Sequence, residues 1–442
     1  MKERLAVVGL AAPAEVGFDQ ALNVTRMTAD SIRDTEVEVF CTELVMSDYE
    51  SAERVAFLLD SEDIAAVLVC VATWSDDNYV LQFLKRLEKP IIFHAYPAME
   101  TGSLCGVMQI ASVLKDIRVD NYRTVYAEVG SEESVKGIVE AFFEIINKKN
   151  DTKAKKESAY YIGSIGGRAA GMTEIAFDEF ALYEKLGALV VNINETELLE
   201  EVNKVSNLKV ISMLPSVINR GFHIDVSEKD IKESLKYYYA MKEIIARYGL
   251  VGLAVKCYTK YMGKVCLGYS LLADEGYACA CEGDVNSAVM MKILKDLTGQ
   301  CVNNADILNP LPDTNEIIFA HCGSSGFSIA PNADEVHLTN VRLMDSGVCS
   351  MFRPKLGTVT AADLVGHGDN LRMSVMVGEA VEKEYLFPGN QACIRFERPV
   401  VDICKDVIKK SCGHHWMIGY GDFTKELEEF CKEHDIIFQN IT

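Results

Sequence analysis

The chain has 442 residues, which is enough for about three domains at roughly 150 residues each. Hydrophobic residues make up 49% of the chain and charged residues 25%, as in globular proteins, so intrinsic disorder is excluded as its main character. Aspartate and glutamate (65) outnumber lysine and arginine (44), and the formal charge of −21 argues against nucleic acid or an anionic membrane as the main partner.

Hydropathy and cysteine usage indicate a cytoplasmic protein. No run reaches the 18 or so apolar residues that would span a bilayer. Residues 5–14 superficially resemble a signal peptide, but a first β-strand followed by a turn is the preferred interpretation. The chain has 14 cysteines, most of them inside apolar runs, which favours buried free thiols in a reducing compartment. Cys279 and Cys281 have ligand-like spacing but lack the second pair that structural zinc needs.

Strand and helix signals alternate along the first third of the chain. Apolar runs predict strands at residues 4–10, 36–40, 65–71, 90–93 and 124–129, with helices at 49–59, 79–87 and 131–147. Alternation of this kind is typical of a doubly wound parallel sheet. The lysine-rich residues 147–158 then favour a solvated linker over a binding patch, because they coincide with a change of unit.

The alternation begins again after this linker. Strands are predicted at residues 159–165, 188–193, 208–213, 252–256 and 277–281, with a helix at 173–186. Ser227 and Asp284 have the pattern of helix N-caps, and Gly249 and Gly299 end the two helices that these caps begin.

The texture changes beyond residue 302. Strands are predicted at residues 317–321, 335–343, 372–377 and 391–396, and several alternate polar and apolar residues as antiparallel strands do. Helices follow only at 402–410 and 423–434. The sequence therefore predicts an α/β protein of three domains. Two doubly wound parallel-sheet domains, residues 1–157 and 158–299, precede a β-rich, barrel-like domain at residues 300–442.

Two carboxylates are the most informative polar residues. Glu282 follows an apolar strand and immediately precedes a helix, at the edge where open α/β sheets place ligands. Asp306 comes 24 residues later, so one helix out and one passage back can bring it beside Glu282. Two carboxylates that share a site need a cation, or one of them must hold a proton.

A histidine would complete a site for a hard metal ion. His321 ends an apolar strand and opens into a glycine loop, so a pocket role and a structural role are both open. His414 and His415 are adjacent, and on a strand at most one of their rings would face a given site. A set of Glu, Asp and His suits Mn²⁺ or Mg²⁺ better than a thiolate zinc site.

The glycine turn Gly163-x-x-Gly166-Gly167 lacks the full dinucleotide fingerprint, so a tight turn is the favoured interpretation.

Several of these motifs resemble one enzyme family. The segment Glu282-Gly-Asp-Val-Asn-Ser-Ala…Leu-Thr-Gly299, followed by Ala305-Asp306, resembles the metal-binding segment of L-fucose isomerases. Further resemblances lie in the passages at residues 163–172, 253–256, 319–326 and 413–421. In the last of these the family histidine stands five residues before Tyr-Gly, and counting back from Tyr420 selects His415. The likeness is closest to the shorter members of the L-fucose isomerase-like superfamily, which include isomerases of sulfoquinovose, a sulfonated glucose.

The resemblance implies an aldose–ketose isomerase that works through an enediol. Glu282, Asp306 and His415 would hold Mn²⁺, or another divalent cation such as Mg²⁺ or Co²⁺, and the two carboxylates would be the acid and base of the proton transfer. It also implies a trimer or hexamer with active sites between subunits. Candidate substrate contacts are Arg168, Lys256, Tyr258, His321, Trp74 and Glu100.

The sugar itself is left open, because residues 9–18 contain no arginine where family members acting on L-fucose carry them. Two other functions are weighed against the isomerase. A non-catalytic sugar-binding or regulatory protein could use the same fold, although all three candidate ligands are retained. A nucleotide-dependent oxidoreductase is supported only by the incomplete glycine turn.

Overall fold

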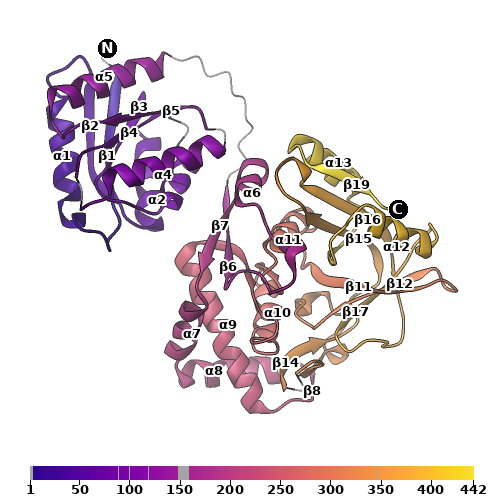
Figure 1. Cartoon of the computed structure of the whole chain (residues 1–442). Helices are drawn as coiled ribbons and strands as arrows, with labels where there is room; N and C mark the ends of the chain where they lie inside the picture. Colours follow the sequence, from indigo (N-terminus) through magenta and orange to yellow (C-terminus); the bar gives the residue numbers. More distant parts are fainter. Residues whose placement is uncertain (1–2, 88, 99, 118, 148–158, 345) are drawn as a thin grey trace. The chain divides into compact units, whose positions relative to one another are not determined.

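A computed structural model describes residues 3–87, 89–98, 100–117, 119–147, 159–344 and 346–442 (Figure 1). The chain forms two compact units, Met1–Ala159 and Tyr160–Thr442. Both are built on parallel sheets, and the second unit also contains a mixed β-rich sheet, so the predicted α/β fold class is confirmed. The division of the second unit at residues 299 and 300 stays a prediction, and most of the lysine-rich linker lies outside the described residues.

The first unit is a five-stranded parallel sheet in the order β2-β1-β3-β4-β5. One face buries α1 and α5 in an apolar cluster with β1, β3 and β4. Helices α2 and α4 contact other parts of the sheet, and α3 packs against these two helices. The elements are β1 Arg4–Leu10, α1 Ala21–Ser31, β2 Glu38–Met46, α2 Tyr49–Asp60, β3 Ala66–Val71, α3 Asp77–Arg86, β4 Ile91–Ala95, α4 Ser103–Asp116, β5 Tyr122–Tyr126 and α5 Glu132–Ile146.

The second unit begins with a four-stranded parallel sheet in the order β10-β9-β6-β7. Its elements are β6 Tyr160–Ile165, α6 Glu179–Leu186, β7 Ala188–Ile193, α7 Glu195–Lys204, α8 Asn207–Ile218, β8 His223–Ile224, α9 Glu228–Tyr248, β9 Leu250–Val255, α10 Cys266–Asp274, β10 Ala278–Ala280 and α11 Val285–Thr298. The predicted caps of α9 and α11 are confirmed: Ser227 and Asp284 accept from backbone N–H groups, and Gly249 and Gly299 adopt positive φ.

The strand predicted at residues 208–213 is wrong, because this segment lies in α8. Ser206 caps the helix by accepting from the Lys209 amide. The buried residues Val210, Leu214 and Val217 recur at the spacing of one helix face, which a short apolar run does not distinguish from a strand.

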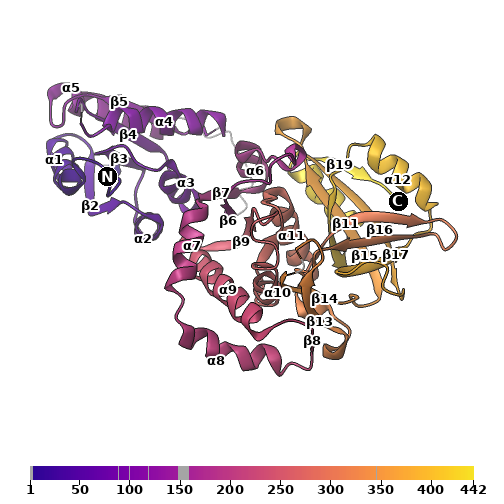
Figure 2. The ribbon, with the colours of Figure 1, turned by 60° about the horizontal axis from the view of Figure 1, so that its bottom comes forward.

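The remainder of the second unit is β-rich. Its strands are β11 Asn303–Leu311, β12 Glu316–His321, β13 His337–Val341, β14 Ser346–Met351, β15 Gly357–Val365, β16 Arg372–Val381, β17 Asn390–Arg395, β18 His415–Tyr420 and β19 Ile437–Asn440, with helices α12 Val400–Lys409 and α13 Thr424–Glu433. The order β15-β18-β11-β12-β17-β16 closes on itself, because β16 also pairs with β15. These strands therefore form a closed barrel (Figure 2), which removes their free edges.

Helix α11 links the parallel sheet to the barrel. It packs on β6, β9 and β10 and also on β15 and β18. Along β18 the side chains alternate: Met417 joins the apolar cluster around α11, whereas Trp416 and Ile418 join a second cluster with α12. The start of β18 is thereby held against the N-terminus of α11, which is where the polar residues described below converge.

The cysteines and the apolar helices bear on the expectations of free thiols and of no segment long enough to span a bilayer. All 14 cysteines lie within the described residues, and all are free thiols. Among those residues no helix is both long enough and apolar enough to cross a membrane.

Candidate active site

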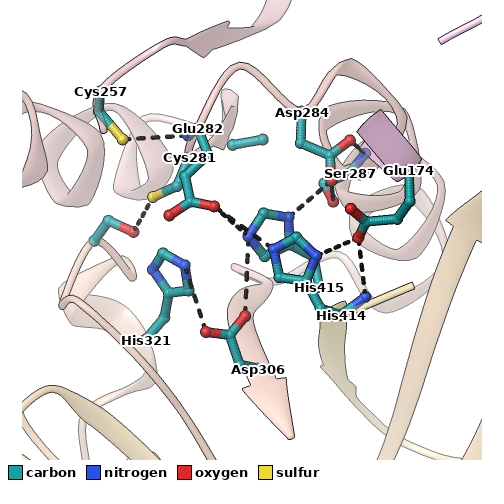
Figure 3. A network of polar contacts seen from close by, with 12 residues as sticks. Glu174, Cys257, Cys281, Glu282, Asp284, Ser287, Asp306, His321, His414 and His415 are labelled. Carbon is teal, nitrogen blue, oxygen red and sulfur yellow. Dashed lines mark hydrogen bonds and ion pairs between the residues drawn. The ribbon is translucent and has the colours of Figure 1, made fainter. Parts of the chain in front are cut away.

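Side chains from four neighbouring elements meet at the N-terminus of α11 (Figure 3). Glu282 follows β10, Asp306 lies on β11, His321 ends β12 and His415 begins β18. The barrel register pairs Asp306 with His415 on one side and with Ala320 on the other. Paired residues on adjacent strands project to the same face of a sheet, so the register itself brings Asp306 and His415 together.

The distances within this group are short. His415 Nε2 lies 3.4 Å from Glu282 Oε2 and 3.9 Å from Asp306 Oδ1. His321 Nε2 lies 4.0 Å from Asp306 Oδ2. Ligand atoms of Glu282, His321 and His415 lie within 4.8 Å of one another. The structure thus brings together the three residues selected as metal ligands. It adds His321, for which the sequence left a pocket role and a structural role open and which was otherwise a candidate substrate contact.

Three atoms of this group are buried without a hydrogen bond. They are Asp306 Oδ1, His321 Nδ1 and His415 Nε2, and none of the described residues donates to or accepts from them. Burying a polar atom without a partner costs free energy, so such a cluster indicates an interaction that the protein side chains do not supply. Imidazole nitrogens and carboxylate oxygens together are the ligands of Mn²⁺-type ions. The residues present therefore fit a divalent cation.

The backbone around Glu282 is tightly fixed. Glu282 adopts φ 64°, and its carbonyl accepts from the Ala169 amide at 2.9 Å. Its amide donates to Cys257 Sγ at 3.2 Å. A Cβ on Gly283 would lie 2.0 Å from the Gly167 carbonyl oxygen, so only glycine fits there. The glycine turn after β6 therefore supports the Glu282 loop, which agrees with its interpretation as a tight turn.

Asp284 orients His415, a role that sequence analysis missed. One carboxylate oxygen of Asp284 caps α11 by accepting from the Ser287 amide at 3.0 Å. The other lies 2.8 Å from His415 Nδ1. With Nδ1–H donated to Asp284, Nε2 is left to face Glu282 and Asp306. The sequence carried one signal for this role: Asp284 is the predicted cap of a helix and lies two residues after Glu282, a candidate ligand.

His414 also reaches the site, so the expectation that only one of the two histidine rings would face it is wrong. His414 precedes the first residue of β18, so the alternation of side chains along a strand does not force its ring to the face opposite His415. Its Nε2 lies 3.6 Å from Glu282 Oε2, and its ring lies against that of His415, with centroids 3.9 Å apart and planes tilted by 39°. Its Nδ1 contacts Glu174, which sequence analysis did not select.

The mutual contacts shift the pKa values of these groups. Burial disfavours the charged form of Glu282, but the neighbouring imidazoles of His414 and His415 outweigh it and hold the pKa of Glu282 well below its usual range. Burial also opposes protonation of His415, yet Asp284 and Glu282 raise the pKa of His415 well above 6.5. The pKa of His321 is lowered, chiefly by burial, so this ring is neutral and able to act as a ligand.

The other candidate substrate contacts in this unit lie around the same loop. The backbone of Arg168 packs against Gly283, and its guanidinium forms no ion pair with any described residue. Lys256 follows β9 and lies 3.7 Å from the Glu195 carboxylate. Tyr258 lies two residues further on and is exposed.

Trp74 and Glu100 belong to the first unit. Trp74 follows β3, is 37% exposed and donates from its ring to Gln109 at 2.7 Å. Glu100 lies in the loop before α4, and the neighbouring Thr101 accepts from the Trp74 amide at 2.8 Å. These two candidates therefore share one edge of the first sheet, and their contribution to the site described above stays a prediction.

The chain is similar along most of its length to several isomerases. A sulfoquinovose isomerase of Alkalicoccus urumqiensis is 24% identical over 387 residues, covering 85% of this chain and 86% of the relative. One from Priestia aryabhattai is 22% identical over 405 residues, covering 88% and 89%. One from Clostridium sp. (strain MSTE9) is 21% identical over 433 residues, covering 94% and 92%. No family model matches the chain.

These relatives confirm the prediction at the level of enzyme class. Their shared name is that of a sugar isomerase, and the similarity spans both units of the chain. The chain is therefore assigned to the enzymes that interconvert aldoses and ketoses.

Proposed function

We propose that this chain is a divalent-metal-dependent aldose–ketose isomerase whose centre is formed by Glu282, Asp306 and His415. The observation that carries the proposal is the convergence of Asp306 Oδ1 and His415 Nε2, both buried and without hydrogen bonds, beside the Glu282 carboxylate. A bound cation would satisfy both of these atoms. A neutral sugar-binding role without a metal does not account for their burial side by side.

His321 is the natural fourth ligand, because one of its nitrogens lies within 4.8 Å of ligand atoms of Glu282 and His415, and its Nδ1 is buried without a partner among the described residues. When bound, Mn²⁺ or a similar ion polarises the sugar carbonyl and lowers the pKa of the adjacent C–H bond. Asp284 keeps the His415 ring in the tautomer that such an ion requires.

Of the three proposed ligands, the two carboxylates are the ones that a substrate can reach. The side chain of Asp306 is 31% exposed and that of Glu282 is 12% exposed, whereas His415 is 2% exposed. One carboxylate takes the proton from one carbon of the substrate and returns it to the neighbouring carbon, while the other exchanges the proton of the sugar oxygen. Glu282 is ionised at neutral pH and can accept such a proton without first losing its own.

Sulfoquinovose is the substrate that we propose, since the similar proteins carry that name. A sulfonate needs a cation that is not already neutralised, and Arg168 meets this condition better than Lys256, which faces Glu195. Following the resemblance to L-fucose isomerases, Mn²⁺ is the proposed ion and a trimer or hexamer with shared active sites is the proposed assembly.

The test is conversion of sulfoquinovose to its ketose by the purified protein, before and after removal of metal with a chelator. We expect activity that is lost on chelation, restored by Mn²⁺ and abolished in Glu282→Gln. D-Glucose is the matched substrate without the sulfonate, and Arg168→Gln should raise KM for sulfoquinovose but not for D-glucose. A protein that binds no metal and converts neither sugar would contradict the proposal and favour a non-catalytic sugar-binding protein.

A further inference from the structure

A cavity lies at the carboxyl ends of β6 and β7, in the same unit as the proposed metal centre. Its volume is about 610 Å³, within the roughly 300–1,000 Å³ of small-molecule sites. It is lined by Ser164, Gly166, Gly167, Asn192, Ile193, Asn194, Glu195, Thr196, Leu199 and Lys260. None of these residues belongs to the proposed metal centre. The position is the edge at which open parallel sheets take ligands.

One lining residue has a buried hydroxyl without a partner. Ser164 is 1% exposed, and no described residue forms a hydrogen bond with its Oγ. A hydroxyl that loses water on folding and gains no protein partner costs free energy. Because Ser164 lines the cavity, a ligand that enters the cavity can supply the missing hydrogen bond.

The carboxylate of Glu195 is fixed at the rim of the cavity. It accepts from Lys260 Nζ at 2.7 Å and from the Tyr261 hydroxyl at 3.1 Å, and Lys256 Nζ lies 3.7 Å away. A Cβ on Gly166 would lie 2.7 Å from Glu195 Cγ, so the glycine makes room for this side chain. A Cβ on Gly167 would meet no atom within 4 Å, so the backbone there faces open space. The acceptor and donor groups are thus held in place before any ligand binds.

The lining offers acceptors and donors together, and this decides the class of ligand. Glu195 and Asn192 present oxygen acceptors, while Lys260 and Ser164 present donors. An anion would face the Glu195 carboxylate, the acidic residue of this lining. A sugar hydroxyl both donates and accepts, so a polyol satisfies such a mixed set. We infer that this cavity is a second binding site, for a neutral polyol of about the size of a monosaccharide.

The cavity and the proposed metal centre share two wall segments. The turn Gly166–Ala169 lines the cavity on one side and donates from Ala169 to the Glu282 carbonyl on the other. Lys256 contacts Glu195, while the next residue, Cys257, accepts from the Glu282 amide. Binding must therefore be measured where the metal centre cannot contribute.

The experiment is isothermal titration of the full chain carrying Glu282→Gln, in chelator, with D-glucose, myo-inositol and inorganic phosphate as separate probes. We expect at least one polyol to bind and phosphate not to bind. Ser164→Ala should weaken polyol binding roughly fivefold, for one neutral hydrogen bond. Glu195→Gln should weaken it roughly tenfold, for a charged acceptor. Glu197→Gln is the matched control, because Glu197 pairs with Arg247 outside the cavity, and it should leave the affinity unchanged.

Two results would overturn the inference: no polyol binds, whether or not phosphate does, or polyol binding persists unchanged in both Ser164→Ala and Glu195→Gln. A thermal melt of each variant separates loss of binding from loss of fold. The inference does not depend on the proposed isomerase activity, because polyol binding in the Glu282→Gln background would remain even if no sugar were converted.

Discussion

Replacing Asp284 by Asn tests whether the tautomer of His415 controls metal binding. One carboxylate oxygen of Asp284 accepts from the Ser287 amide at 3.0 Å, while the other lies 2.8 Å from His415 Nδ1 and also accepts from the Ser287 hydroxyl at 2.6 Å. In Asp284→Asn the remaining carbonyl oxygen keeps the helix cap, so the NH₂ group faces His415. Nδ1 must then act as an acceptor, and the ring proton moves to Nε2, the atom that faces Glu282 and Asp306.

The magnitude follows from the two roles of this residue. Asn is about as good an N-cap as Asp, so the cap of α11 contributes almost no change in stability. Loss of the partner that orients a ligating histidine typically lowers metal affinity 10–100-fold, which corresponds to about 1.4–2.8 kcal/mol. We therefore expect Mn²⁺ binding to weaken by about 10–100-fold while the fold is retained.

The assay is titration of the chelated protein with Mn²⁺, followed by calorimetry or by the spin-resonance signal of free Mn²⁺. Asp48→Asn is the matched control, because Asp48 also caps a helix, accepting from the Ser51 amide, and touches no histidine. If Asp284→Asn binds Mn²⁺ within twofold of the unaltered chain, the argument from the tautomer is refuted. Equal losses in Asp284→Asn and Asp48→Asn would refute it as well.

The remaining predictions concern protons and close packing. Because the pKa of His415 is raised, Mn²⁺ must displace a proton from it. Mn²⁺ affinity should therefore rise about tenfold per pH unit near neutrality, with a proton release that calorimetry in buffers of different ionisation enthalpy measures. Buried Asp363 accepts from the Gly413 amide, and burial raises the pKa of Asp363 to about 7. Folding favours the protonated form of Asp363, so the free energy of unfolding of the unaltered chain, relative to that of Asp363→Asn, should fall by about 2 kcal/mol between about pH 5.5 and 7.5. Urea unfolding of the two proteins measures this difference, and a difference that does not change with pH would contradict the prediction. Gly283→Ala places a Cβ 2.0 Å from a carbonyl oxygen, so it should destabilise the fold by about 2 kcal/mol or more in thermal unfolding. Gly299 also has a positive φ, but a Cβ there would meet no atom within 4 Å, so Gly299→Ala should lower the free energy of unfolding by only about 1 kcal/mol. Equal losses in the two variants would show that the close contact at Gly283 is unimportant.

Local sequence patterns were sufficient where the structure depends on near neighbours. The caps at Ser227 and Asp284 and the helix ends at Gly249 and Gly299 were predicted because capping involves groups within a few residues. The alternation of strand and helix signals predicted the parallel sheets, because these signals also come from residues that are close together in the sequence. The segment at residues 208–213 failed, because a short apolar run fits a buried strand and a helix face equally well.

The sequence by itself determined that Glu282 precedes a helix at the end of a strand, and the resemblance selected Asp306 and His415 as its partners. Only the tertiary structure decided the rest. The antiparallel register of β11 with β18 sets Asp306 opposite His415, and no local pattern encodes a pairing between residues more than a hundred positions apart. The packing of α11 between the sheet and the barrel gives its cap, Asp284, a second partner in His415. His321, His414 and Glu174 enter the site in the same way, since contacts across the fold depend on how its elements pack.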